Sequence, residues 1–364
     1  MHTHHRVPAW SWLAPALAGA LVLLKLAGLV PVTSVATLSI AAVLLGAVIF
    51  ASVHHAEVLA SRVGEPAGSI ILALAVTIIE VAMIASIMLA DSEGSDVVAR
   101  DTVFSAVMIV LNGVVGLCLV LGGRRHHEQR FRLDAASSAL AVLGVLATLV
   151  LVLPNYVRAG GARQFSSPQL MVAGAVTFLL YGVFLFVQTV RHRDYFMQED
   201  DGAEADEAAT SPPGRVTLAS AVLLPLALAM VIGLAKLLSQ PLDAAVRAAG
   251  LPQAFVGVVI AAIVLTPEAI ASTRAAIRNR LQNSINLVLG SALASIGLTI
   301  PAVTVIASAT GRPLTLGLEP QYAVLLVLSL FVSTITLGTG RTTVLQGAVH
   351  LAIFAVFVTF SAMP

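Results

Sequence analysis

The sequence has 364 residues, of which 58% are hydrophobic and only 11% are charged, and its formal net charge is +1 at pH 7. A soluble protein carries about 25% charged residues, so this composition excludes an ordinary water-soluble domain and predicts a protein that lies in a lipid bilayer. The basic residues cluster only in the loops between apolar stretches, so no nucleic acid is expected as a partner. The one cysteine, Cys118, excludes an intrachain disulfide.

Eleven apolar stretches are long enough to cross a hydrocarbon core of about 30 Å. Each should be helical, because a backbone in lipid must satisfy its own hydrogen bonds. The first stretch is interpreted as a retained span, since no small-residue cleavage site follows it. The predicted spans lie at 13–30, 32–51, 67–90, 102–122, 133–153, 169–190, 216–239, 252–273, 285–309, 321–338 and 343–362.

Arginines in the loops indicate the orientation, because cytoplasmic loops carry an excess of Lys and Arg. Assigned alternately to two sides, the loops place thirteen arginines on one side and five on the other. We therefore expect a cytoplasmic N-terminus and, with an odd number of spans, an external C-terminus. The larger group comprises Arg6, Arg62, Arg124, Arg125, Arg130, Arg132, Arg191, Arg193, Arg215, Arg274, Arg278, Arg280 and Arg341, and the smaller Arg100, Arg158, Arg163, Arg247 and Arg312.

A polar stretch at 191–215 divides the chain into two sets of five spans. Its residues 199–207 read EDDGAEADE, a composition that cannot bury a core and predicts a cytoplasmic linker, either a solubilising hinge or a surface that senses cations. The predicted organisation is an N-terminal tail and extra helix at 1–31, a five-helix repeat at 32–190, the linker, and a second five-helix repeat at 216–364. An odd-numbered repeat gives the two copies inverted topology, as in transporters that bind substrate near the membrane midplane.

Two glutamates stand inside apolar spans, Glu80 in 67–90 and Glu268 in 252–273, each in the second span of its repeat. A carboxylate at mid-membrane depth costs roughly 2.5–3.5 kcal/mol on insertion scales, so it indicates a functional site. Oxygen-bearing side chains stand near both glutamates in the sequence or in the next span, and Pro267 frees a backbone carbonyl one turn before it. The predicted cation ligands are Glu80, Glu268, Thr77, Thr266, Asn112, Asn286 and Ser291.

Oxygen ligands of this kind suit hard cations such as Ca²⁺. Two neighbouring carboxylates are costly to keep ionised without a cation, so protons should replace the cation when it leaves. This competition predicts cation/proton exchange. Three further polar residues have structural explanations: a cap of a span for Asp101, an interfacial position for His55, and a packed helix contact for His350.

Several of these segments resemble a known family. Gly64–Gly68 with Thr77–Val81, Ala99–Thr102 with Met108–Gly113, and Arg278–Gly297 resemble the signatures of calcium/proton antiporters of the cation/Ca²⁺ exchanger superfamily, in its bacterial ChaA-type branch. The resemblance implies two inverted five-helix repeats, an acidic segment between them, and exchange of cytoplasmic Ca²⁺, and also Na⁺ or K⁺, against external H⁺. It assigns the two central glutamates to Glu80 and Glu268.

The sequence departs from the family pattern at three ligand positions. Thr77 and Leu265 stand where many relatives carry asparagine, and Gly290–Ala294 lacks a common glutamine. A monovalent Na⁺ or K⁺/H⁺ antiporter with little Ca²⁺ transport is therefore an alternative to a Ca²⁺/H⁺ antiporter. An uncoupled cation channel and an intramembrane enzyme are further alternatives, although neither an Asp-Asp-x-x-Asp nor a His-Glu-x-x-His motif occurs.

The expected setting is the inner membrane of a bacterium. Eighteen of the twenty basic residues are arginine, as in proteins from GC-rich bacterial genomes. The expected partners are the lipid bilayer and small inorganic cations. No cofactor is expected, and the sequence gives no prediction of the oligomeric state.

Overall fold

A computed structural model describes residues 7–31, 34–64, 67–90, 94–157, 163–196 and 212–363. Within these ranges, eleven helical segments are long and apolar enough to cross a membrane, which confirms the predicted number of spans and the all-α membrane fold. The acidic residues 199–207 lie outside the described residues, so the prediction for the linker stays a prediction.

Several helices extend beyond their predicted ends. α2 (Val35–Val63) continues twelve residues past 51, and α9 (Gly214–Ala248) continues nine residues past 239. The added turns carry His54, His55 and Arg62 in α2, and Asp243 in α9. Apolar runs mark only the part of a helix that lies in hydrocarbon, whereas the backbone hydrogen bonds continue into the polar interface.

Unit 1 comprises Met1–Ser92 and Asp200–Ala245. Its helices are α1 (Ala9–Leu26), α2, α3 (Ala67–Met88) and most of α9. α2 packs against both α1 and α3. A small core joins α2, α3 and α9, with Ala56, Ala75 and Leu224 buried at its centre.

His55 holds three helices of unit 1 together. Its ring is fully buried, and Nδ1 lies 3.0 Å from the hydroxyl of Ser220 on α9. Nε2 donates to the carbonyl of Ser11 on α1 at 3.1 Å. The sequence predicted an interfacial position for His55. The structure instead buries His55 between helices of unit 1.

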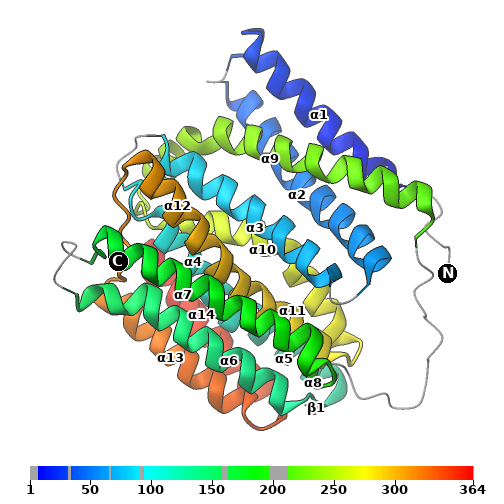
Figure 1. Cartoon of the computed structure of the whole chain (residues 1–364), viewed down its shortest axis with the longest axis vertical. Helices are drawn as coiled ribbons and strands as arrows, with labels where there is room; N and C mark the ends of the chain where they lie inside the picture. The colour runs from blue at the N-terminus through cyan, green and yellow to red at the C-terminus, as the bar shows by residue number, and fades with distance from the viewer. Residues whose placement is uncertain are drawn as a thin grey trace. The chain divides into compact units, whose positions relative to one another are not determined.

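Unit 2 comprises Glu93–Glu199 and Val246–Pro364. Its membrane-length segments run in chain order as α4 (Val98–Met108), η1 (Ile109–Val114) and α5 (Val115–His126); α6 (Leu133–Ala147), η2 (Thr148–Val152) and η3 (Leu153–Asn155); α7 (Ser167–Phe186) and η4 (Val187–Arg191); α10 (Phe255–Ile277); α11 (Leu281–Ala294), η5 (Ser295–Thr299) and α12 (Ile300–Thr310); α13 (Pro320–Leu337); and α14 (Val344–Ala362). The short α8 (Arg193–Phe196) follows η4, and β1 (Gln129–Arg130) pairs antiparallel with β2 (Arg341–Thr342) (Figure 1).

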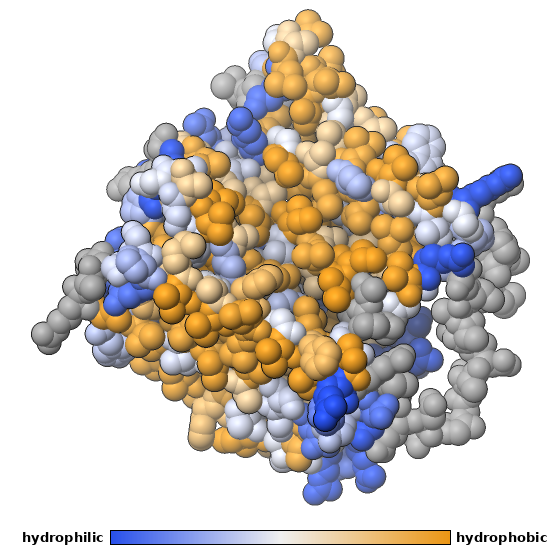
Figure 2. All heavy atoms as spheres, viewed as in Figure 1, coloured by the Kyte–Doolittle hydropathy of each residue, from blue (hydrophilic) through white to orange (hydrophobic). Residues whose placement is uncertain are grey.

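The connections of unit 2 gather at two opposite ends, as the alternating assignment of loops predicts. At one end, the backbone N–H of Arg132 donates to the side-chain oxygen of Gln282 at 2.6 Å, and β1 pairs with β2. At the other end, Thr315 donates to the carboxylate of Asp96 at 2.6 Å, and the N–H of Gly317 donates to the carbonyl of Arg163 at 3.0 Å. On the face in view, hydrophobic residues cover α7 and hydrophilic ones gather near α8 and β1 (Figure 2).

Asp101 does not cap α4, contrary to the prediction. α4 begins at Val98 after the N-cap residue Val97, so Asp101 lies within the first turn. Its carboxylate accepts a hydrogen bond of 2.7 Å from Nε of Arg100, and both side chains are buried. Arg100 also donates to the carbonyl of Gly317 at 3.2 Å. This ion pair fastens the start of α4 to the segment before α13.

α10 runs parallel to the span formed by α4, η1 and α5. Gly257 lies against the backbone of Asp101 and Thr102, and near the other end Oγ1 of Thr273 lies 3.9 Å from Sγ of Cys118. A Cβ atom on residue 257 would come within 2.6 Å of the backbone carbon of Asp101. Backbone atoms cannot move aside as a flexible side chain does, so this contact requires glycine.

Gly257→Ala should therefore destabilise the protein by about 1–3 kcal/mol, the cost of overpacking a tight core. The matched control is Gly144→Ala in α6, where nothing lies within 4 Å of the added Cβ. Replacing a helical glycine there should leave stability unchanged or raise it by about 0.5–1 kcal/mol. The midpoint of thermal unfolding in detergent measures both. Equal midpoints for the two variants would contradict the close contact.

Candidate cation site

Glu268 lies inside α10, directly after Pro267, and only 7% of its surface is exposed. Pro267 has no N–H, so the carbonyl of Ile263 loses its helical donor and is available to another group. A buried carboxylate next to a freed carbonyl is an arrangement of oxygens that attracts a cation.

Ser272 shares the face of α10 that carries Glu268, because residues four apart lie one above the other on a helix. Its side chain is fully buried, and its hydroxyl makes no hydrogen bond within the described part of the chain. The sequence analysis did not select Ser272, although its spacing from Glu268 could have identified it. A buried hydroxyl without a partner is costly, so this position favours a polar ligand.

The helices next to α10 bring two predicted ligands to the level of Glu268. Gly257 of α10 and Asp101 of the parallel span lie at the same depth, because they are in contact. Glu268 is eleven residues after Gly257, and Asn112 is eleven residues after Asp101. α11 runs antiparallel to α10 after a turn at 278–280. Glu268 lies nine residues before the end of α10, so the residue at the same depth lies about nine residues into α11, near Ser291. Both helices pack against α10. Asn112 and Ser291 therefore lie at the depth of Glu268.

Asn112 belongs to a buried hydrogen-bonded cluster. Its Nδ2 donates to the hydroxyl of Ser329 on α13 at 2.8 Å, and its Oδ1 accepts from Nδ1 of His350 on α14 at 3.3 Å. All three side chains are fully buried. The sequence predicted that His350 packs against a neighbouring helix. The structure shows this contact as a hydrogen bond to Asn112. Ser329 was not among the predicted residues, because its link to Asn112 joins positions 217 residues apart.

Both spans that pack beside α10 contain π-helical turns. η1 includes Asn112, and η5 includes Gly297, which lies against the ring of Tyr181. η1 packs on α11, and η5 packs on α4. π-helical turns inside α-helices occur frequently at functional sites, because they displace side chains and loosen backbone hydrogen bonds locally.

The other predicted carboxylate lies in unit 1. Glu80 is 4% exposed within α3, and Thr77, one turn before it, is 7% exposed. The hydroxyl of Thr77 makes no hydrogen bond within the described part of the chain. Thr77 and Glu80 thus form a buried polar pair on one helix, while the remaining predicted ligands belong to unit 2.

The structure directs two predicted ligands elsewhere. Thr266 lies two residues from Glu268, about 200° around the helix, and its hydroxyl donates to the carbonyl of Ala262 at 2.6 Å. Asn286 lies more than one turn of α11 from Ser291; its Nδ2 donates to the carbonyl of Phe196 at 2.6 Å, and its Oδ1 accepts from Gln282. Asn286 therefore anchors α8 to α11.

No group of three or more His, Cys, Asp and Glu side chains that could hold a metal occurs in the described ranges. A transition-metal centre would need such a group of strong ligands. Carboxylates combined with hydroxyl, amide and backbone oxygens instead suit alkali and alkaline-earth cations. The chemistry of unit 2 around Glu268 therefore agrees with a hard cation.

Comparison with known proteins identifies the family. The family model for sodium/calcium exchanger proteins matches residues 33–190 and 219–363. The chain belongs to the sodium/calcium exchanger family. Within it, the chain is 64% identical to the y4hA protein of Sinorhizobium fredii, over 98% of this chain and 97% of that protein. It is 39% identical to the sodium-potassium/proton antiporter ChaA of Escherichia coli, over 85% of this chain and 84% of that one.

A solved structure shares the fold of this chain. The Ca²⁺/H⁺ antiporter protein YfkE aligns with a TM-score of 0.72 at 17% sequence identity, over 97% of this chain and 99% of that chain. The chain is thus a multi-pass membrane transporter of the exchanger family and not an enzyme, as predicted. The composition-based expectation of a bacterial protein agrees with these bacterial relatives.

Ser329→Ala should weaken both stability and transport, because it removes the acceptor for Nδ2 of Asn112 and leaves that donor buried. The expected loss is about 1–3 kcal/mol of stability. Thr334→Ala is the control on the same helix, since its hydroxyl donates to the carbonyl of Leu330 on an exposed face. Thermal unfolding and cation uptake measure the difference. If the two variants behaved identically, the Asn112 cluster would have no part in the cation site.

Proposed function

We propose that the protein is a secondary active antiporter that exchanges a cytoplasmic cation for external H⁺. The observation that carries the proposal is one buried carboxylate in each of two apolar helices, Glu80 in α3 and Glu268 in α10. Each burial costs roughly 2.5–3.5 kcal/mol on insertion scales, a cost that binding of a cation or proton offsets. The 39% identity to a sodium-potassium/proton antiporter supports the same function.

In this proposal each carboxylate binds the transported cation or a proton, Glu80 with the hydroxyl of Thr77 in unit 1, and Glu268 with oxygens of Asn112, Ser291 and Ser272 in unit 2. The carbonyl that Pro267 frees is a further candidate ligand. When the cation leaves, protons neutralise the carboxylates. A carboxylate that holds a proton cannot bind the cation with its full charge, so the two substrates compete and one replaces the other.

A monovalent cation, Na⁺ or K⁺, is the first candidate substrate. Two observations support it: the 39% identity to a sodium-potassium/proton antiporter, and the absence of asparagine at Thr77 and Leu265. Fewer amide oxygens leave a smaller ligand shell, whereas Ca²⁺ takes six to eight oxygens. Ca²⁺ is the second candidate, because two carboxylates match its charge.

The protein operates, in this proposal, in the bacterial inner membrane with its N-terminus in the cytoplasm and its C-terminus outside. The unequal distribution of arginine between the loops supports this orientation. The two five-helix repeats at 32–190 and 216–364 would then have inverted topology. The buried glutamate in the second helix of each repeat, and the π-helical turn in the third, support that relationship.

In proteoliposomes with an imposed pH gradient, Na⁺ or K⁺ should collapse the gradient, and Ca²⁺ should do so less efficiently. The apparent KM for the cation should rise as pH falls, because protons then occupy more of the carboxylates. A pH-sensitive dye inside the vesicles measures both effects. Cation entry that leaves the pH gradient intact would instead indicate an uncoupled channel.

Glu80→Gln and Glu268→Gln should each abolish coupled exchange, with at least a hundredfold loss of rate, while membrane insertion is retained. The amide keeps the size of the side chain but removes its charge and its ability to release a proton. Glu128→Gln is the control, because the carboxylate of Glu128 lies at the surface and faces Arg130 and Arg341 at 3.7 and 3.9 Å. Wild-type exchange in either central variant would exclude that glutamate from the site.

A further inference from the structure

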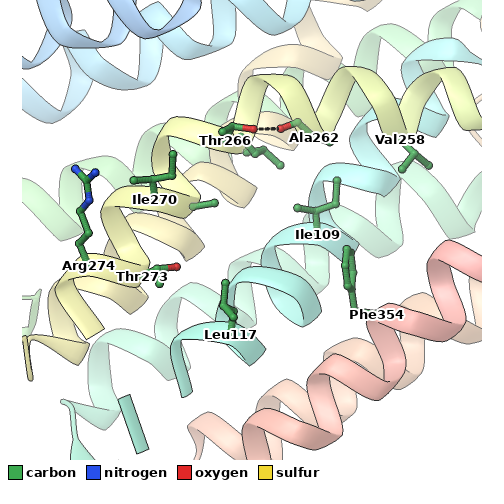
Figure 3. Close-up of a pocket in the computed structure, with 11 residues that line it drawn as sticks. Ile109, Leu117, Val258, Ala262, Thr266, Ile270, Thr273, Arg274 and Phe354 are labelled. Atoms are coloured by element: carbon green, nitrogen blue, oxygen red, sulfur yellow. Dashed lines mark hydrogen bonds between the residues drawn. The ribbon is translucent and has the colours of Figure 1, made fainter. Parts of the chain in front are cut away.

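An apolar groove of about 480 Å³ runs along α10 on the surface of unit 2. α10 forms one wall, while η1, α5 and α14 contribute Ile109, Leu117 and Phe354 (Figure 3). It extends from Val258 to Arg274, sixteen residues apart, which is about 24 Å along a helix. This length corresponds to most of the thickness of the hydrocarbon core, about 30 Å.

The groove suits hydrocarbon, because its few hydroxyls are turned to other partners. Thr266 donates to the carbonyl of Ala262. Thr273 lies against the thiol of Cys118 at 3.9 Å. A polar occupant would therefore find few hydrogen-bonding groups between Val258 and Thr273, whereas an acyl chain would fill the groove without leaving a polar atom unsatisfied.

A basic pocket of about 470 Å³ adjoins the groove at the end of α10. Arg125, His126, Arg274, Ile277 and Arg278 line it. Arg274 lines both spaces, so the apolar groove and the basic pocket are continuous at this residue. In Figure 3, Arg274 stands at the opposite end of the groove from Val258.

The three arginines of this pocket form no ion pair with a carboxylate in the part of the chain that the structure describes. Arg130 and Arg341, near the same end of unit 2, instead lie within 4.0 Å of Glu128. Three guanidinium groups around one pocket, without an acidic partner, favour a phosphate group, which arginine binds through paired N–H donors.

We propose that this continuous surface binds an anionic glycerophospholipid, with one acyl chain in the groove and the phosphate against Arg125, Arg274 and Arg278. Basic pockets between membrane helices recognise lipid headgroups in this way, and each arginine near the surface contributes about fivefold in affinity. In the orientation predicted from the loops, the lipid belongs to the cytoplasmic leaflet. The site stands on residues of unit 2 and does not depend on the cation that is transported.

Native mass spectrometry of the full-length protein, titrated with phosphatidylglycerol or with phosphatidylethanolamine of the same acyl chains, tests the proposal. Wild type should bind phosphatidylglycerol preferentially. The double variant Arg274→Gln/Arg278→Gln should weaken phosphatidylglycerol binding about 25-fold, from about fivefold for each arginine. The matched control, Arg130→Gln/Arg341→Gln, removes the same charge from arginines that already face Glu128 and should retain wild-type affinity. Equal losses in both pairs would overturn the proposal.

A second pair of variants tests the groove without changing charge. Ala262→Trp/Ala269→Trp should fill the groove and reduce phosphatidylglycerol binding at least tenfold, while Leu179→Trp, at a side chain that is 65% exposed on α7, should have no effect. Unchanged binding in the filled groove would indicate a site for free phosphate, and the lipid proposal would fail.

Discussion

Polar groups in hydrocarbon must be satisfied within the protein, and the organisation of this chain follows from that constraint. Lipid offers no hydrogen bonds, so each span is helical, and its polar side chains either face other helices or bond to the backbone of their own helix, as Thr334 does. The carboxylates of Glu80 and Glu268 are the most costly groups under this constraint, and both are buried. Their burial indicates that the chain does more than anchor in a membrane, because anchoring alone requires no buried carboxylate.

Close packing of helices supplies the surroundings that such groups need. Glycine allows α10 to touch the backbone of α4 at Gly257, and α14 to touch α5 at Gly347. The added Cβ of residue 347 would lie 2.7 Å from the backbone nitrogen of Val120. These contacts fix the relative register of the helices inside unit 2. Register in turn sets which side chains share the depth of Glu268, so small residues far from the carboxylate determine its neighbours.

The sequence predicted the parts of the fold that depend on local pattern. Eleven apolar runs gave eleven spans, and the two anomalous glutamates were found because each stands alone among apolar residues. Tertiary partners were beyond its reach: Ser329 is an unremarkable serine until α13 is placed against η1. The assignment of Thr266 shows a different limit, since proximity in sequence to Glu268 was given more weight than the angle between their side chains around α10.

The cluster around Asn112 has a direction. His350 donates to Asn112, Asn112 donates to Ser329, and Ser329 donates to the carbonyl of Leu325 at 2.7 Å. Each donor polarises the next, so the bonds reinforce one another as an ordered dipole. If one of the three side chains alone exchanged its donor and acceptor, two donors or two acceptors would face each other. Imidazole tautomer, amide orientation and hydroxyl rotation of His350, Asn112 and Ser329 are therefore tied together, so these three groups change their proton arrangement together.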